Sequence, residues 1–302
     1  ATNNTASTCS CYGVRSVGLS SLYEHNTTTG GCRSGADGAR FAIIRYNTLT
    51  DIVGSYGGFH ADSIGYIDGG ADGLCDYGWI YGNLIDNYVE GIPLYYTGGG
   101  TYGWVAHSNL IICRRSTTGT GDAACLLNGC DHLYLLNNTL VGLNGTAYGI
   151  TGTAFAVFED RTPDSQNCVL KNNLVAGSGG AAIRFDATEH TGTVCQRNHY
   201  YLPGETTPFM YDGAAKTLAQ WQALGYDSQG FHATHGISTD PSFTSISTGD
   251  FSLAASSPDL NAGEDLSAYF TLDKNGVSRV GKWSLGAIES ATGNGAEETS
   301  GY

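Results

Sequence analysis

The chain is poor in charge, in proline and in methionine. Charged residues make up 14% of its 302 residues, against about 25% in a typical soluble domain, and only six prolines and one methionine occur. So few charges argue against a surface of exposed helices, each of which carries a charged face. The sequence also lacks an apolar run of about 18 residues, so it predicts no membrane span.

Basic residues are the scarcer of the few charged ones. The chain has 14 Lys and Arg against 28 Asp and Glu, which gives a net charge of −14. Nucleic acids and anionic membranes bind basic surfaces, because cationic side chains release their counterions. The composition therefore excludes nucleic acid as a partner, and it disfavours a polyuronate unless Ca²⁺ bridges the two.

Nine cysteines are present, but none forms a Cys-x-x-Cys pair of the kind that binds zinc. Disulfides in an oxidising compartment are the better interpretation, so we expect a secreted or cell-surface protein whose export signal preceded Ala1. The odd number leaves one thiol over or paired between subunits, and the pairing stays open. The predicted disulfide cysteines are Cys9, Cys11, Cys32, Cys75, Cys113, Cys125, Cys130, Cys168 and Cys195.

Four Asn-x-Ser/Thr triplets are compatible with N-glycosylation. Chance alone also produces such triplets in a chain so rich in Asn and Thr. The candidate glycosylation sites are Asn3, Asn26, Asn137 and Asn144.

Glycine and tyrosine are abundant, with 44 and 19 residues, and a short motif of the form apolar-x-x-Asn-x-apolar recurs through the middle of the chain. Successive Asn residues of the motif lie 36, 26, 29, 35 and 25 positions apart. This spacing is too irregular for an array of helical repeats, but it suits solenoid coils that carry loops of different length. The six copies contain Asn47, Asn83, Asn109, Asn138, Asn173 and Asn198.

The motif predicts an all-β fold, a right-handed parallel β-helix. Each coil would place short strands on the faces of the solenoid at a spacing of about 4.8 Å, with apolar columns inside and Asn at a bend. We expect five or six coils over residues 39–200, preceded by an N-terminal extension or cap (1–38) that could contact another subunit. A second strand series is expected at residues 63–67, 91–95, 123–127, 155–158 and 181–185.

The segment 201–302 has a different character. Thr217 and Gln220 form a capping box that opens a helix reaching about Leu224. This helix is expected to cover the open edge of the last coil, where unpaired strands would otherwise invite further pairing. The segment as a whole is expected to be a cap and tail packed on the solenoid.

Short motifs in this C-terminal segment resemble those of a known family. The matching stretches are residues 218–222 (LAQWQ), 240–243 (DPSF), 249–253 (GDFSL), 256–263 (SSPDLNAG) and the pattern Asp273…Gly276…Arg279…Gly281…Leu285-Gly286-Ala287-Ile288-Glu289. They look like the end of exported bacterial right-handed parallel β-helix repeat proteins, which belong to the pectate-lyase-like superfamily and carry a choice-of-anchor Q type C-terminal region. The resemblance covers residues 40–290. It implies the fold and export, whereas the activities it implies range from polysaccharide lyases to phage appendages.

Catalytic signatures of these relatives are missing from the sequence. The Gly-His-Gly of hydrolytic pectinases is absent, and only four lysines are available as a lyase base. Polar residues do gather at the ends of the second strand series, where a glycosidic acid/base site or a surface ion-pair ladder would use them. The candidate catalytic residues are His60, Asp62, Glu159, Asp160, Arg184 and Asp186.

Two further groups of residues could bind ligands. The repeated Gly-Ala-Asp-Gly at 35–38 and 70–73 suggests either a Ca²⁺ site or plain turns, with Asp68, Asp72 and Asp76 as candidate Ca²⁺ ligands. Aromatic residues could stack on sugar rings or form a subunit contact, since both uses favour Tyr and Trp. The candidates for this second role are Tyr95, Tyr96, Tyr102 and Trp104.

The sequence thus supports two functions. The first is a non-enzymatic, self-associating extracellular protein that forms a surface fibre or appendage, glycosylated or in contact with glycans. The alternative is a secreted polysaccharide lyase, a hydrolase or a carbohydrate-binding β-helix protein. The missing catalytic signature favours the first function, and the family resemblance supports the second.

Overall fold

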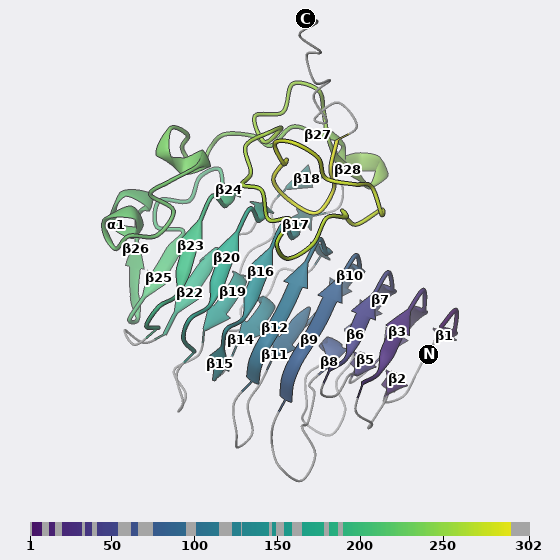
Figure 1. The fold of residues 1–302 in the computed structure, drawn as a ribbon. Coiled ribbons are helices and arrows are strands. Elements are labelled where there is room, and N and C mark those ends of the chain that lie inside the picture. The colour runs from purple at the N-terminus through teal and green to yellow at the C-terminus, as the bar shows by residue number, and fades with distance from the viewer. Residues whose placement is uncertain are drawn as a thin grey trace, which may run out of the picture.

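The protein folds as a parallel β-helix, as predicted from the recurring Asn motif (Figure 1). The chain winds from the N-terminal coil at one end of the stack to the last coil at the other, and each coil places strands in three long parallel sheets. The computed structural model describes residues 2–7, 12–15, 20–31, 34–37, 41–53, 62–65, 75–94, 101–114, 123–127, 129–144, 147–148, 154–158, 165–177, 181–186 and 190–290.

Sheet A contains the strand that precedes each Asn of the motif. Its inward column runs from Tyr23 through Ile80 and Leu135 to Cys195, and all of these side chains are buried. The residues on either side of this column point outward, because successive side chains of a strand alternate between its faces. Its strands are β3 (Leu22–Glu24), β6 (Ile43–Arg45), β9 (Cys75–Tyr81), β12 (Thr101–His107), β16 (Tyr134–Leu136), β20 (Val169–Lys171) and β23 (Val194–Gln196), with β15 (Cys130–Asp131) beside β12.

Sheet B contains the strand that follows each Asn of the motif. Its inward column includes Leu49, Ile85, Ile111 and Leu140, which complete the apolar columns predicted from the motif. Its strands are β1 (Thr5–Ser7), β4 (Thr27–Gly31), β7 (Thr48–Ile52), β10 (Leu84–Tyr88), β13 (Leu110–Cys113), β17 (Thr139–Asn144), β21 (Leu174–Ala176) and β24 (His199–Tyr201), with the short β18 (Ala147–Tyr148) antiparallel to β17.

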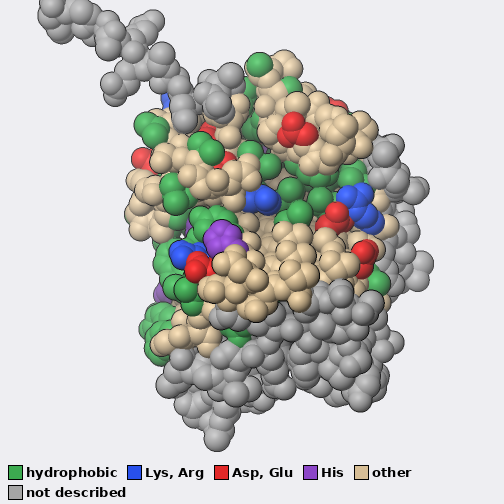
Figure 2. Space-filling view, turned by 90° about the vertical axis from the view of Figure 1, so that its right-hand side faces the viewer, with side chains coloured by type: hydrophobic (Ala, Val, Ile, Leu, Met, Phe, Trp, Pro, Cys, Tyr) green, Lys and Arg blue, Asp and Glu red, His purple; other side chains and the backbone are tan. Residues whose placement is uncertain are grey.

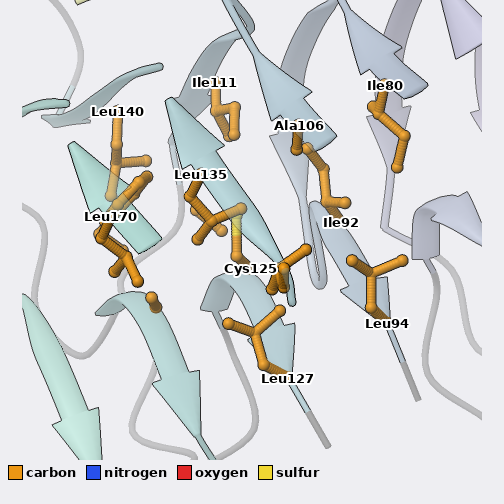
Figure 3. Close-up of a cluster of buried hydrophobic side chains, with 14 of the residues drawn as sticks. Ile80, Ile92, Leu94, Ala106, Ile111, Cys125, Leu127, Leu135, Leu140 and Leu170 are labelled. Carbon is orange, nitrogen blue, oxygen red and sulfur yellow. The ribbon is translucent and has the colours of Figure 1, made fainter. Parts of the chain in front are cut away.

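Sheet C corresponds to the second predicted strand series. Its inward residues, such as Leu94 and Leu127, meet those of sheets A and B in one continuous core (Figure 3). Its strands are β11 (Ile92–Leu94), β14 (Ala123–Leu127), β19 (Ala154–Phe158), β22 (Ile183–Phe185), β25 (Phe209–Tyr211) and the antiparallel β26 (Ala214–Lys216). A small parallel sheet of β2 (Tyr12–Arg15), β5 (Ser34–Asp37) and β8 (Asp62–Gly65) continues this face toward the N-terminus, where β8 bridges to the residues before β11.

Five of the predicted disulfide cysteines are buried in the solenoid, and none of the five forms a disulfide. Cys125 lies among apolar side chains of the core (Figure 3), and burial raises the pKa of the Cys125 and Cys168 thiols. These cysteines fill the core as small apolar side chains, so the disulfide prediction is wrong for them. They are Cys113, Cys125, Cys130, Cys168 and Cys195, whereas Cys9, Cys11 and Cys32 and the side chain of Cys75 lie outside the described residues.

The motif asparagines form a buried ladder at the corner between sheets A and B. The backbone N–H and the side-chain amide of each Asn both donate to Oδ1 of the next, as in Asn83 to Asn109 at 3.1 and 3.0 Å. The side-chain amide also donates to a carbonyl of the preceding coil, here from Asn109 to Ile80 at 2.8 Å. Backbone N–H groups can only donate, so they fix the amide orientation and give the ladder one direction, from the N-terminal to the C-terminal coil.

The ladder is longer than the sequence motif. It begins at Asn4 and Asn26 and ends at Asp227, whose Oδ1 accepts from the backbone N–H and the side-chain amide of Asn198 at 3.2 and 3.0 Å. The predicted glycosylation of Asn26 is therefore wrong, because its side-chain amide is buried and donates to Asn47. Asn3 is exposed, and the side chain of Asn144 lies outside the described part of the chain.

The predicted boundaries of the solenoid need correction at both ends. Strand β1 pairs in parallel with β4, and β4 with β7, so residues of the expected N-terminal extension (1–38) form coils of the same solenoid. At the other end β25 continues sheet C beyond residue 200. The sequence motif did not detect the early coils, because the inward position of β4 holds Thr28 and not a large apolar residue.

A short helix covers the C-terminal end of the stack (Figure 1). Helix α1 (Leu218–Ala223) begins at the predicted capping box of Thr217 and Gln220, with both reciprocal hydrogen bonds present. Its Trp221 is fully buried and stacks on Phe209 of the last coil, with ring centroids 4.8 Å apart. No helix in the described ranges is long and apolar enough to cross a membrane.

Residues 240–290, which we name the strap, return along the outside of the ladder corner (Figure 1). They include β27 (Phe243–Ser245) and β28 (Asp250–Leu253), while two 3₁₀ turns lie at Phe231–Ala233 and Ile246–Thr248. The side-chain amide of Asn137 donates to the carbonyls of Ser284 and Gly286 at 3.0 and 3.1 Å. Because Asn137 is buried under the strap, its predicted glycosylation is also wrong.

A buried ion pair organises the strap from within. Arg279 donates to Glu289 at 2.8 Å and to the carbonyl of Gly286 at 2.8 Å, and both charged side chains are almost inaccessible to solvent. Asp273 accepts from the backbone N–H groups of Asn275, Val277 and Glu289 at 2.7–2.9 Å. The pattern Asp273…Arg279…Glu289 therefore encodes one hydrogen-bonded unit.

Replacing Asn109 by Ala should unfold the solenoid at a clearly lower urea concentration. The change leaves a backbone N–H of Asn83 and the carbonyl of Ile80 buried without their partner. Each unpaired buried group costs about 1–3 kcal/mol, so we expect a loss of at least about 2 kcal/mol. Asn275→Ala, at an exposed position, is the control, and equal midpoints for the two variants would contradict the ladder's role.

Replacing Arg279 by Met should loosen the strap, because Glu289 would remain buried without its partner. The expected loss is about 3–5 kcal/mol, measured as faster hydrogen exchange of the Lys274 and Ala287 amides. The double variant Arg279→Met/Glu289→Leu should recover much of the protection, since it buries no unpaired charge. Unchanged exchange in the single variant would argue against this pair as the strap's organiser.

Candidate functional site

The structure does not bring the predicted catalytic residues together. Arg184 on β22 and Asp186, which directly follows this strand, form a bidentate ion pair with each other. Asp62 starts β8, which lies four strand steps away through β11, β14 and β19, or roughly 19 Å at the usual strand spacing. His60, Glu159 and Asp160 lie outside the described residues.

The predicted calcium ligands also give no described site. Asp68 and Asp72 lie outside the described residues, and Asp76 is described only as part of β9. In the described ranges no three His, Cys, Asp or Glu side chains are grouped as a metal site would need. The Ca²⁺ prediction therefore stays a prediction.

Of the predicted sugar-stacking residues, Trp104 lies inside the solenoid, whereas Tyr102, which precedes the left-handed Gly103, is partly exposed and meets the ring of Tyr77. Trp104 is fully buried in the core, so its predicted exposure is wrong. It lies two positions before the inward Ala106 and shares its face, because the side chains of β12 alternate. Tyr95 and Tyr96 lie outside the described part of the chain.

Sheet A is bounded by two corners at which the backbone is left-handed in every coil. At the first corner Phe41, Tyr77 and His132 have φ of 57°, 51° and 58°; at the ladder corner His25 and Tyr46 both have φ of 54°. A left-handed conformation costs about 1–2 kcal/mol for a residue with a side chain, and it is unusual for bulky ones. Aromatic residues held in this way mark the outer face of sheet A as a candidate site.

Aromatic side chains at and beside the first corner form a continuous row across four coils, the outer aromatic row. The ring centroids of Phe41 and Tyr77 are 5.8 Å apart and the rings are parallel; Tyr77 meets Tyr102 at 5.3 Å, and Tyr102 meets His132 at 4.8 Å. Phe41 and Tyr77 are 48% and 50% exposed. Such a stack packs successive coils together and still leaves ring surface open to solvent.

Glycine in the following coil makes room for the left-handed aromatic residues. A Cβ on Gly103 would lie 2.6 Å from the ring of Tyr77, and a Cβ on Gly82 would lie 2.6 Å from the ring of Tyr46. In each pair the glycine occupies the same corner position one coil later, also with a positive φ of 72° or 67°. The sequence contains this signal, since Tyr46 and Gly82 each directly precede a motif Asn.

A pocket beside the row lies between sheet A and the strap. Trp79 and Tyr81 form its floor, and Tyr269 and Phe270 of the strap form its wall, together with Ile43, His107, Thr271 and Leu272. His107 stacks between Tyr81 and Phe270, with centroids 4.8 and 3.9 Å away. Burial lowers the pKa of His107 to about 3, so its imidazole is neutral at physiological pH.

The row and this pocket together form the aromatic trough, which carries little free charge. Arg45 donates to Glu24 and to the hydroxyl of Tyr81, both at 2.8 Å. At the other end of the row, Asp131 accepts from His132 at 2.7 Å, with the imidazole protonated at Nδ1, and from Asn167 at 2.9 Å. The trough therefore suits an uncharged ligand with flat apolar faces and hydroxyl groups.

No family model matches the sequence, and the search of curated proteins found no match. The resemblance to exported β-helix repeat proteins thus stays a prediction.

Replacing Gly103 by Ala should destabilise the protein and displace the ring of Tyr77. The added Cβ meets the Tyr77 ring and must also adopt the left-handed backbone, for a total of about 2–4 kcal/mol. Adding Tyr77→Ala should relieve the contact but not the backbone strain. A double-mutant cycle that gives no coupling between the two positions would contradict the packing described above.

Proposed function

We propose that the protein is an extracellular glycan-binding β-solenoid whose aromatic trough holds the sugar rings of an extended chain. The exposed outer aromatic row carries this proposal, because it keeps bulky rings at strained left-handed positions and open to solvent. The negative face of an aromatic ring attracts the C–H groups of a sugar. The resemblance to exported β-helix proteins supports the extracellular location.

The geometry of the row suits a repeating ligand. Rings follow one another at 4.8–5.8 Å along the stack, close to the advance of one sugar ring in an extended polysaccharide. The repeat of the solenoid thereby offers the same contact to successive sugars. An uncharged chain is favoured, because the protein has a net charge of −14 and the charged side chains beside the trough are already paired.

Binding is better supported than hydrolysis. The two described carboxylates that flank the trough, Glu24 and Asp131, lie on β3 and β15, which are four strand steps apart, so the two groups are separated by at least roughly 19 Å. Glycosidases hold their two carboxylates about 5–9.5 Å apart. Each of the two groups also accepts a hydrogen bond from a neighbouring side chain, Glu24 from Arg45 and Asp131 from His132.

A fibre built by stacking coils end to end is less well supported. The ladder ends at the Asp227 carboxylate, which also accepts from Tyr200 and Trp221 at 2.9 and 3.1 Å. A second copy stacked on this end would bring Asn4 Oδ1, an acceptor by the ladder's direction, toward another acceptor. Helix α1 covers the same end. Self-association through a side face remains compatible with the proposal.

A panel of neutral and acidic polysaccharides, measured by affinity electrophoresis and calorimetry, tests the proposal. Tyr77→Ala should weaken binding of the ligand that the panel identifies by roughly tenfold, about 1.4 kcal/mol. Tyr201→Ala, on sheet B, removes a ring of the same size away from the trough and should change nothing. No binding across the panel, or equal losses in both variants, would contradict the proposal, and release of shortened products would indicate an enzyme.

A further inference from the structure

A second hollow adjoins the trough at the ladder corner, and among the described residues its one basic side chain forms no ion pair. Its described lining is His25, Tyr46, Asn47, Thr48, Gly82, Leu84 and the strap residues Lys274, Asn275 and Gly276. None of these residues is acidic, in a chain that has twice as many acidic as basic residues. Seen from the N-terminal end (Figure 2), the strap overhangs the first coils, and a basic side chain is visible between them.

The ammonium group of Lys274 has no hydrogen bond or ion pair to any described residue. The carboxylate of the neighbouring Asp273 accepts from three backbone N–H groups within the strap, so it acts on Lys274 through its charge and not through a hydrogen bond. Desolvation lowers the pKa of Lys274 despite the opposing charge of Asp273. Two other basic groups near this corner form ion pairs, Arg45 with Glu24 and Arg114 with Asp86.

The hollow is held in place by both the solenoid and the strap. The backbone N–H of Lys274 donates to the carbonyl of Ala287 at 2.9 Å, and the N–H of Ala287 donates to Thr139 Oγ1 of β17 at 2.8 Å. On the solenoid side, Tyr46 stacks on His25 with centroids 5.4 Å apart and lies over Gly82. The backbone of Lys274 therefore occupies a fixed position beside the hollow.

The hollow continues the aromatic trough. Tyr81 forms part of the trough's pocket and meets Tyr46 edge to face, with ring centroids 5.5 Å apart. Along β9, the five residue steps from Tyr77 to Gly82 span roughly 17 Å in an extended strand. A chain of a few sugars can therefore reach from the outer aromatic row to Lys274.

We infer that the hollow binds an oxyanion carried by a sugar, either a carboxylate or a sulfate ester, through Lys274. The inference rests on the proposed glycan function for the source of the anion, and it adds a charged subsite to an otherwise uncharged trough. A single acidic substituent is compatible with the net charge of the protein, whereas a densely charged polyanion is not. Lys274 would then distinguish substituted from unsubstituted chains.

Nuclear magnetic resonance at low salt tests the inference with sodium glucuronate, sodium sulfate and glucose as probes. The ring signals of His25 and Tyr46 report on the hollow. We expect saturable shifts with glucuronate or sulfate, at least tenfold weaker binding in Lys274→Met, and no saturable shift with glucose. A response to one anion alone identifies the carboxylate or the sulfate as the group recognised.

Lys282→Met is the matched control, because it removes the same charge at an exposed position of the strap. Equal weakening in both variants, or no saturable shift with either anion, would overturn the inference. If neutral oligosaccharides bind through Tyr77 but no anion binds, the inference fails and the proposed function stands. If the anions bind through Lys274 and no oligosaccharide binds, the anion subsite stands and the proposed function fails.

Discussion

The Asn ladder satisfies the buried backbone groups at one corner of every described coil, and the stacking of the sheets follows from it. Every coil must turn sharply between sheets A and B, and the turn buries backbone groups that no strand can pair. The side-chain amide solves this in each coil, since it accepts from the coil before and donates to the coil after, as Asn109 does between Asn83 and Asn138. The ladder thereby sets the register in which the apolar columns stack.

The ladder also fixes what lies beside it. The residue before each ladder Asn has a left-handed backbone, and its side chain lies over the following coil. In the early coils this position holds His25 and Tyr46, which line a hollow. In later coils it holds Asn137 and Asn172, whose amides hydrogen-bond the strap. One repeated corner thus lines a hollow at one end and attaches the strap at the other.

The strap covers only part of the solenoid, and its side chains make the coils beneath it different from the others. Phe270 closes the pocket over Tyr81 and His107, and the buried pair of Arg279 and Glu289 holds the turn that carries Lys274. The site is therefore shared between coils near the N-terminus and a segment near residue 274. The residues of the strap that line the candidate site are not part of the repeat. They can therefore change without loss of the solenoid fold.

The parallel β-helix, the two apolar columns and the capping box of Thr217 and Gln220 could be predicted from the sequence, because they depend on local spacing and on the stacking of equivalent residues. The sequence did not determine which polar residues meet. Arg184 and Asp186 pair with each other, Trp104 lies inward, and Asn26 and Asn137 are buried, since loops of unequal length and the path of the strap set those contacts. Only the tertiary structure placed Lys274 beside Tyr46, across more than two hundred residues.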